Sequence, residues 1–350
     1  MKTIDADAHV IETPKTWSYM REDEQDFCPQ IFARDPDDGA PRASSQRDDY
    51  WVVEQRLLTK SNLGKDVPVE ARDMLDIERR LSHMDEIGID IQVLYPSIFL
   101  RPISAQPDAD YALARSYNRW LADIWKQSGD RLRWVAVPPL LSLQDPGIVR
   151  EELEFCKENG ACGIFMRGME CERLLSHRYF FDLYDIAQQL DLAICLHAGV
   201  GSFPYHDLLR PQSALMTFKF SVMGSFNGLL EEEVPARFPE LRWAFIETSA
   251  QWVPYVLGEA RLRLALRGRK APDDLLDYAN FYITTQKTDN LPWLLSEIGD
   301  DHLIIGTDYG HKDTATEVEV FRRMSADGDL PQESVSKILE ANPARLYALT

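Results

Sequence analysis

Length and composition indicate a folded globular protein rather than a disordered one. The chain has 350 residues, of which 45% are apolar, 27% are charged and 10% are aromatic, so a sizeable core can form. The 57 acidic and 38 basic residues give a formal net charge of −19, a field that repels polyphosphate and anionic membrane surfaces. We therefore expect neither a nucleic-acid partner nor a membrane partner.

Several further classes of protein are excluded by missing sequence features. No apolar run approaches the roughly 18 residues of a membrane span, and the first residues lack the apolar stretch of a signal peptide. These two absences predict a cytoplasmic protein. The five cysteines form no CxxC pair, so we expect reduced thiols and neither a disulfide framework nor a structural zinc cluster. The absence of a GxGxxG motif counts against a nucleotide cofactor.

Eight short runs rich in β-forming residues recur along the chain, separated by stretches with helical spacing. One helical stripe runs from Ile77 to a glycine stop at Gly88, and another helix is expected to start at Asp145 and Pro146. Apolar strands that alternate with helices describe an α/β fold with a parallel sheet covered on both faces. Eight repeats favour a closed (β/α)8 TIM barrel over an open doubly wound sheet, which is the alternative. The predicted strands are Thr3–Asp7, Asp90–Tyr95, Trp134–Pro138, Cys162–Met166, Ala193–His197, Arg242–Glu247, Phe281–Thr285 and His302–Thr307.

Two connections are too long for a plain strand-to-helix unit. Residues from about 13 to 75 follow the first strand and include the charged segment 34–54, and residues from about 198 to 235 follow the fifth strand. Loops that follow strands lie on the C-terminal face of a barrel, where they shape substrate pockets. We expect both long loop insertions to be lids or contacts between subunits, within a single domain of residues 1–350.

The first strand ends in Asp5-Ala6-Asp7-Ala8-His9, where strand alternation sends Asp5, Asp7 and His9 to the same side. A carboxylate and an imidazole two residues apart can chelate one divalent ion, because oxygen and nitrogen ligands at about 2.0–2.2 Å fit that spacing. The alternative is a charged strand end with a hydrogen-bonded histidine. This segment alone does not decide between the two interpretations.

His197 and Asp308 close two further predicted strands. A lone histidine in such a place is more often a core residue than a ligand, and an aspartate alone is only suggestive. Together with Asp7 and His9, however, both lie at C-terminal strand ends, where barrel enzymes place their sites. The first and eighth strands are also neighbours in a closed barrel. The four residues leave room for water or substrate, as a catalytic metal site requires.

Four segments of the chain carry a resemblance to a known family. As a set they resemble the amidohydrolase superfamily, and within it the amidohydrolase-related branch that contains aminocarboxymuconate-semialdehyde decarboxylase and γ-resorcylate decarboxylase. The resemblance implies a (β/α)8 barrel with one divalent ion, usually zinc and sometimes manganese, held by Asp7, His9, His197 and Asp308. It also implies a homo-oligomer. The four segments are Ile4–His9, Leu196–Gly199, Glu247–Tyr255 and Ile305–Asp313.

Three positions depart from the pattern that this resemblance implies. Many members of the superfamily have His-x-His on the first strand, where this chain has Asp7, but a carboxylate also ligates zinc or manganese. On the sixth strand, decarboxylases of the group often present a histidine used in proton transfer, and this chain has Glu247. Either Glu247 takes that role or the chemistry differs. Arg167 ends the strand on which two-metal hydrolases carry a carboxylated lysine, which favours a single-metal site.

Further residues are candidates for contact with the substrate. The planar guanidinium of Arg167 suits either a substrate carboxylate or an ion pair with a loop acid, and the sequence does not separate these roles. His311 is a candidate to bind a substrate oxygen or to orient Asp308. Tyr95 and Trp252 supply aromatic surface near strand ends, consistent with a planar substrate, although such residues are more often core.

These observations predict a metal-dependent lyase that decarboxylates an aromatic or unsaturated carboxylic acid without oxidation. The ion, zinc before manganese, would act as Lewis acid and template, while Asp308 or Glu247 delivers a proton to the carbon that loses the carboxylate. The alternative enzyme is a hydrolase of an amide, lactone or C–C bond that uses a metal-activated water, with Asp308 as proton acceptor. A third hypothesis is a catalytically silent barrel that uses its metal or its long loops for binding.

Overall fold

The computed structural model describes residues 2–33, 49–59, 63–64, 66–209, 213–311 and 318–349. Most of the charged segment 34–54, which the sequence analysis assigned to a long insertion, lies outside the described residues. Lys312 and Asp313, the last two residues of the fourth family segment, lie outside them as well.

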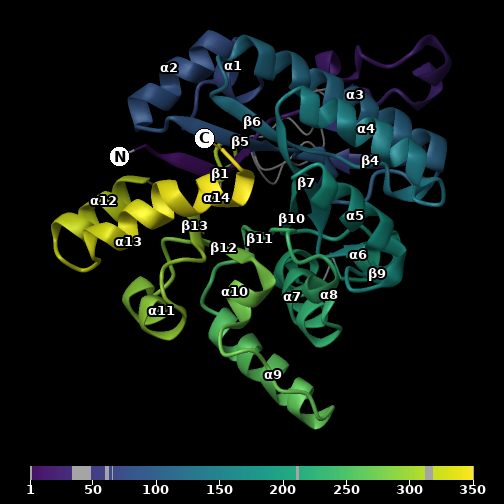
Figure 1. Cartoon of the computed structure of the whole chain (residues 1–350). Coiled ribbons are helices and arrows are strands. Elements are labelled where there is room, and N and C mark those ends of the chain that lie inside the picture. Colours follow the sequence, from purple (N-terminus) through teal and green to yellow (C-terminus); the bar gives the residue numbers. More distant parts are fainter. Residues whose placement is uncertain are drawn as a thin grey trace.

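Eight parallel strands form the centre of the molecule, with helices around them (Figure 1). The strands are hydrogen-bonded in the order β1-β5-β6-β7-β10-β11-β12-β13. The segment after the last strand returns to the first, because Asp308 N–H donates to Asp7 O at 2.9 Å and His9 N–H donates to Tyr309 O at 2.8 Å. These bonds nearly close the barrel. The strands are β1 (Ile4–His9), β5 (Ile91–Tyr95), β6 (Leu132–Ala136), β7 (Ala161–Arg167), β10 (Ala193–His197), β11 (Trp243–Ile246), β12 (Phe281–Thr285) and β13 (Leu303–Ile305).

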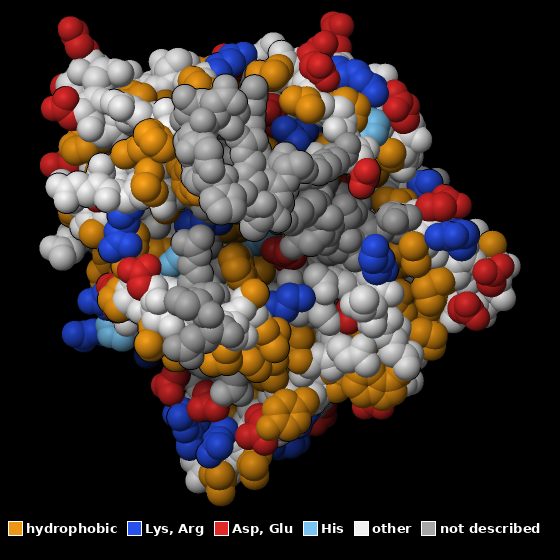
Figure 2. All heavy atoms as spheres, turned by 180° about the vertical axis from the view of Figure 1, so that it is seen from behind, with side chains coloured by type: hydrophobic (Ala, Val, Ile, Leu, Met, Phe, Trp, Pro, Cys, Tyr) orange, Lys and Arg blue, Asp and Glu red, His pale blue; other side chains and the backbone are white. Residues whose placement is uncertain are grey.

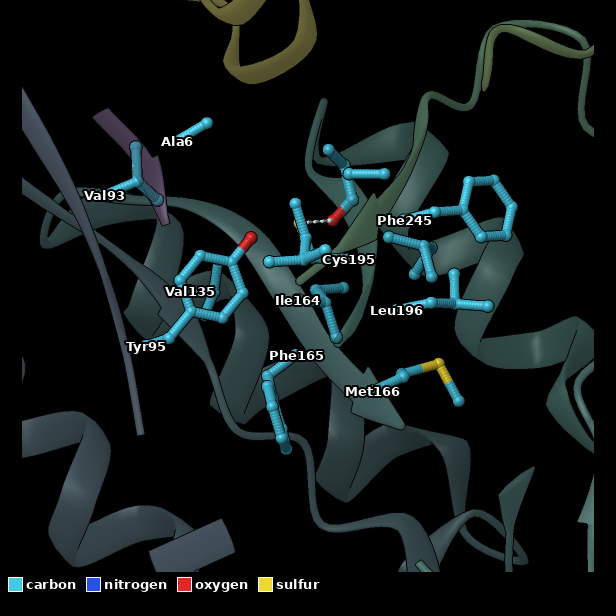
Figure 3. Packing of buried hydrophobic residues seen from close by; sticks show 14 of the residues in the cluster. Ala6, Val93, Tyr95, Val135, Ile164, Phe165, Met166, Cys195, Leu196 and Phe245 are labelled. Carbon is cyan, nitrogen blue, oxygen red and sulfur yellow. Dashed lines mark hydrogen bonds between the residues drawn. The ribbon is translucent and has the colours of Figure 1, made fainter. Parts of the chain in front are cut away.

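This architecture confirms the predicted (β/α)8 barrel, and each of the eight predicted strands overlaps an observed one. The strands are buried on both sides, because side chains of one face fill the barrel and those of the other face pack under the helices. In the interior, Tyr95, Val135 and Cys195 lie on the inner faces of their strands, whereas Ile164, next to Gly163 on β7, faces the helices (Figure 3). Burial on both faces explains why the strands read as nearly continuous apolar runs.

The helices begin and end where the sequence signals them. The side chain of Asp76 caps α2 by accepting from Arg79 N–H, and α2 stops at Gly88, which adopts a left-handed φ of 74°. Asp145 caps α4 in the same way. Figure 1 shows α9 projecting away from the barrel. The helices are α1 (Val69–Arg72), α2 (Ile77–Ile87), α3 (Pro107–Gln127), α4 (Pro146–Glu158), α5 (Phe181–Gln189), α6 (Phe203–Leu209), α7 (Ser221–Glu231), α8 (Val234–Arg237), α9 (Val253–Leu266), α10 (Leu275–Ala279), α11 (Leu291–Ile298), α12 (Val318–Ala326), α13 (Gln332–Ser336) and α14 (Asn342–Tyr347).

The described parts of the two long connections contain regular structure. Between β1 and α1 lies a three-stranded antiparallel sheet of β2 (Gln30–Ala33), β3 (Asp49–Val53) and β4 (Arg56–Thr59). Between β10 and β11 the chain forms α6, α7 and α8. After β7, two short strands, β8 (Met169–Glu170) and β9 (Arg173–Leu174), form a small antiparallel hairpin.

Side chains of both charges lie on the described surface. On the face shown in Figure 2, Lys and Arg side chains lie scattered among Asp and Glu side chains. None of the described helices combines the length and the apolar character needed to cross a bilayer. All five cysteines are free thiols, as the sequence analysis predicted.

Candidate metal centre

The structure brings together the four residues predicted as metal ligands. Asp7 and His9 lie at the end of β1, His197 ends β10, and Asp308 follows β13. All four are buried, with at most 1% of each exposed. His9 Nε2 lies 3.5 Å from Asp7 Oδ1 and 3.4 Å from Asp308 Oδ1, and His197 Nε2 lies 3.3 Å from Asp7 Oδ1. At the C-terminal end of the barrel, His9 is therefore shared by two groups of possible metal ligands, one with Asp7 and His197 and the other with Asp308 and His311.

The tautomers of the two histidines fit a cation at this point. His9 Nδ1 lies 3.1 Å from Pro96 O, and His197 Nδ1 lies 3.0 Å from Ala198 O. Because a carbonyl oxygen only accepts, each Nδ1 carries a hydrogen, and each neutral ring then presents a lone pair at Nε2. The two Nε2 atoms are 3.1 Å apart, so they repel each other unless a proton or a metal ion lies at this point. Asp7 Oδ2 is also buried with no hydrogen-bond partner among the described residues, and this donor set fits a divalent ion.

The pKa values of the two histidines diverge for a related reason. Burial, reinforced by His311 and His197, holds the pKa of His9 well below its usual range. Burial opposes the charge of His197 too, but the charge and the hydrogen bond of Asp7 outweigh it and raise the pKa of His197 to about 9. Without an ion, the pair thus holds one proton where the ion would bind. Metal binding must displace this proton, which couples metal affinity to pH.

His311 lies directly beside this group. Its Nδ1 is 2.7 Å from Asp308 Oδ1, and its ring stacks on that of His9 with centroids 4.0 Å apart. Asp308 adopts a left-handed φ of 54°, an uncommon backbone conformation for a residue other than glycine. The backbone turn after β13 and the His311 contact together hold the Asp308 carboxylate against His9.

Glu247 lies at the edge of the same group. It follows β11 with a left-handed φ of 60°, and its Oε2 is 3.7 Å from His197 Nδ1. Its side chain is 17% exposed, so it is reachable from outside, whereas the four candidate ligands are fully covered. Burial, with the charge of Asp308 adding to it, raises the pKa of Glu247 to about 8. In the protein without metal this carboxyl group therefore keeps its proton near neutral pH.

Arg167 lies farther along the mouth of the barrel, and its hydrogen-bond donors are engaged. Its Nε and Nη2 donate to the two carboxylate oxygens of Glu170, both at 2.7 Å. Its Nη1 donates to Phe99 O at 3.0 Å and to Arg101 O at 2.7 Å. Of the two roles that the sequence left open, this is the geometry of the ion pair with a loop acid.

The two aromatic candidates, Tyr95 and Trp252, pack into the protein. The hydroxyl of Tyr95 bonds that of Tyr347 at 2.7 Å, and its ring centroid lies 5.3 Å from that of His197. Tyr95 therefore lies in the barrel interior next to a candidate ligand. Trp252 packs against Phe226, with ring centroids 5.0 Å apart, and donates from Nε1 to Thr248 O. A contact of either side chain with the substrate stays a prediction.

The sequence analysis missed two polar residues behind the centre. Ser97 Oγ lies 2.8 Å from His311 Nε2 and donates to Val10 O at 2.7 Å. Glu12 accepts from the backbone N–H groups of Ser97 and Ile98, and its burial raises its pKa to about 7. The signal available for Ser97 was its place two residues after the end of β5, at the mouth of the barrel.

Comparison with known proteins adds a family and several structural likenesses. A family model described as amidohydrolase matches residues 4–349. An amidohydrolase of Mycobacterium avium subsp. paratuberculosis K-10 is 17% identical, with a TM-score of 0.79 and coverage of 100% of this chain and 98% of that chain. A dihydroxybenzoic acid decarboxylase of Polaromonas sp. JS666, whose structure contains manganese and the inhibitor 2-nitroresorcinol, is 20% identical, with a TM-score of 0.67 and coverage of 99% and 97%. The 4-oxalomesaconate hydratase of Rhodopseudomonas palustris is 19% identical, with a TM-score of 0.64 and coverage of 99% and 95%. At these identities the structural likeness concerns the fold.

Proposed function

Because the chain belongs to the amidohydrolase family of enzymes, we propose that it decarboxylates an aromatic or unsaturated carboxylic acid without oxidation, with the help of one divalent ion. The observation that carries the proposal is that Asp7, His197 and Asp308 all lie around His9, with the two Nε2 atoms 3.1 Å apart. These four residues would hold the ion, zinc as the first expectation and manganese, present in the Polaromonas decarboxylase, as the second. When bound, the ion supplies Lewis-acid polarisation of substrate oxygens.

The chain's own residues must supply a proton in this reaction. The bond between the carboxylate and its carbon breaks, the electron pair stays on that carbon, a C–H bond forms there, and CO₂ leaves. We assign the proton donor to Glu247, because its carboxyl group lies beside His197 and is partly exposed, so that a substrate at the centre can reach it. Asp308 is less suited, because His311 Nδ1 holds it at 2.7 Å beside the ligands. His311 thus positions Asp308.

The contacts of Arg167 favour a structural role over that of a substrate anchor, because Glu170 occupies two edges of its guanidinium. For Tyr95, any substrate contact would involve the ring, since its hydroxyl is bonded to Tyr347. The substrate is therefore expected to be held mainly by the metal centre and by apolar walls. A substrate carboxylate would bind at the ion rather than at Arg167.

Hydrolysis is the second candidate, and the pair of Asp308 and His311 is the observation that favours it. An aspartate held beside a histidine at 2.7 Å is able to accept a proton from water at the same centre. Isotopes separate the two reactions. In D₂O, deuterium at the carbon that lost the carboxylate supports the lyase, whereas ¹⁸O from water in the product supports hydrolysis.

The metal centre is tested first, by elemental analysis of protein purified without added metal. We expect about one zinc or manganese ion per chain, as a catalytic site of this kind holds. The His9→Ala/His197→Ala double variant should lose it. His177→Ala is the matched control, since His177 caps the short helix Arg178–Phe180 away from the centre. If the wild-type protein binds no metal even after reconstitution, the proposal is wrong.

The reaction is tested with a panel of aromatic carboxylates and CO₂ detection. Glu247→Gln should keep the metal and lower the turnover number by about 10²- to 10⁴-fold, the usual contribution of a general acid. Equal turnover in Glu247→Gln and the wild type would remove Glu247 from the mechanism. If the metal-loaded protein releases CO₂ from none of the carboxylates, the proposed decarboxylation is wrong, and hydrolysis is the reaction to test next.

A further inference from the structure

A cavity lies beside the candidate metal centre, between the C-terminal ends of β5, β6 and β7 and the first turn of α3. Its cavity volume is about 130 Å³, close to the roughly 150 Å³ of an apolar cavity that holds one benzene ring. Most of its walls are apolar, and three of them are aromatic rings. The main apolar walls are Phe99, Ile103, Val137, Leu140, Phe165 and Phe203.

The cavity adjoins the metal centre through neighbouring strands. Phe165 lines the cavity, and its ring centroid lies 6.1 Å from that of His197. Arg167, another lining residue, pairs in register with His197 across β7 and β10. A ligand in the cavity would therefore lie next to the residues that bind the ion, with Phe165 between them.

The charged residues of the cavity do not offer a site for an anion. Arg167 and Glu170 both line it, and they neutralise each other through two parallel hydrogen bonds at 2.7 Å. The remaining charged lining residues, Asp110 and Glu172, are acidic. A carboxylate would therefore enter a cavity whose one cation is already paired and whose other charges repel it.

The carboxylate of Asp110 can accept more hydrogen bonds than the described residues donate to it. Its Oδ2 accepts from Leu141 N–H at 3.1 Å, and no second hydrogen bond or ion pair reaches its side chain among the described residues. Desolvation raises the pKa of Asp110 to about 7, because one N–H group compensates poorly for the lost water. A ligand group that donates a hydrogen bond would supply what this carboxylate is missing.

We infer that this cavity binds the non-reacting end of an aromatic ligand that carries a hydroxyl or amino group, with Asp110 as the acceptor, and that it rejects an anionic end. This inference rests on the proposed function, because the proposed function places the reacting end of the substrate at the metal centre. It narrows the substrate class to an acid whose far end is an aromatic hydroxyl or amine. Binding of that far end alone does not require the reaction.

The test uses phenol, benzoate and toluene as probes, titrated into the full-length protein at pH 8, where Asp110, with a pKa of about 7, is ionised, and followed by ligand-observed NMR. Phenol should bind at least fivefold more tightly than either toluene or benzoate, and chelation of the metal should leave phenol binding in place. Asp110→Leu should reduce the affinity for phenol to that for toluene. Asp108→Leu, in the exposed part of the same helical turn, should change neither affinity. Ile103→Trp, which fills the cavity, should abolish binding of phenol and toluene.

Three results would overturn the inference: benzoate binding as tightly as phenol, an unchanged ratio of phenol to toluene affinity in Asp110→Leu, or loss of phenol binding on chelation. If Asp110→Leu does not fold, the Ile103→Trp variant and the comparison of the three probes still test whether the cavity binds phenol. The metal content of the same samples separates this inference from the proposed function. If the protein binds phenol but holds no metal, only the proposed function is overturned. If the protein holds metal but does not bind phenol, only the inference is overturned.

Discussion

The guanidinium of Arg80 lies over the ring of Tyr309, 3.7 Å from its centroid, at the seam where β1 meets the segment after β13. Arg80 is completely buried and reaches His9 O with Nη1 and Nη2, both at 3.4 Å, and Gln92 Oε1 with Nε at 2.7 Å. Tyr309 follows Asp308 directly and accepts from His9 N–H. One buried cation thus fixes the backbone at two candidate metal ligands that are far apart in sequence.

We therefore predict that Arg80→Met weakens metal binding by roughly 10- to 100-fold, the range observed when groups that orient metal ligands are removed. The physical reason is that His9 O loses its donors and Tyr309 loses the cation that packs on it. Arg79→Met is the matched control, because Arg79 is on the outer side of the same helix and pairs with Glu86. Competition with a chromophoric chelator measures both affinities. Equal metal affinity in the two variants would contradict the prediction.

Ser97 fixes the orientation of His311 and gives a second prediction. Because Ser97 Oγ–H donates to Val10 O, its oxygen accepts from His311 Nε2–H, and the 2.7 Å contact of His311 Nδ1 with Asp308 Oδ1 then needs a second hydrogen between those two atoms. Ser97→Ala removes this acceptor, so we expect a loss of about tenfold or more in turnover with the metal still bound. Ser97→Thr keeps a hydroxyl and should restore most of the turnover. A variant series in which Ala and Thr behave alike would show that the hydroxyl does not act through His311.

The sequence predicted the strands and the candidate ligands because both depend on local patterns. Apolar runs of strand length end in Asp7, His197 and Asp308, and in a barrel every such end lies on the same face. Chain order alone then brings β1 beside β13.

The remaining contacts depend on closure of the barrel and on loop conformation. Arg80 meets Tyr309 and Ser97 meets His311 across more than 200 positions of the chain, a pairing that no local pattern specifies. Arg167 is another case, since the sequence left its role open. Its pairing with Glu170 depends on the short turn between β7 and β8, which returns the carboxylate to the strand end.

The raised pKa of Asp110 leads us to predict that the free energy of unfolding depends on pH. The pKa of Asp110 in the folded protein, about 7, lies above its ordinary value of 3.8, so the folded state holds the proton more tightly than the unfolded chain. The contribution of Asp110 to the free energy of unfolding is therefore fully present below pH 4 and is lost as pH rises to about 7. We expect a loss of about 2 kcal/mol, discounted because the side chain is only half-buried and solvent screens its charge.

Denaturation at pH 4 and pH 7.5 measures this contribution as the difference between wild type and Asp110→Asn. The amide keeps an oxygen for Leu141 N–H but does not titrate, so the variant should lose less stability than the wild type as pH rises. Asp108→Asn, on the same turn but exposed, should follow the wild type. A parallel pH dependence of wild type and Asp110→Asn would show that Asp110 is not held in the neutral form.

A substitution at Gly201 tests the rigidity of the ion pair between Arg167 and Glu170, which leaves the cavity without a free cation for an anion. A Cβ at this position would overlap Glu170 Oε2 and would lie 2.7 Å from Arg167 Nη2, so Gly201→Ala must push the ion pair apart. We expect a loss of about 1–3 kcal/mol in the free energy of unfolding, as for other overpacked sites. Gly224→Ala is the control, because no neighbouring heavy atom lies within 4 Å of its added carbon and alanine suits a helix better. Urea denaturation should rank Gly201→Ala below wild type and Gly224→Ala at or above it, and the opposite ranking would mean that Glu170 moves freely away from Arg167.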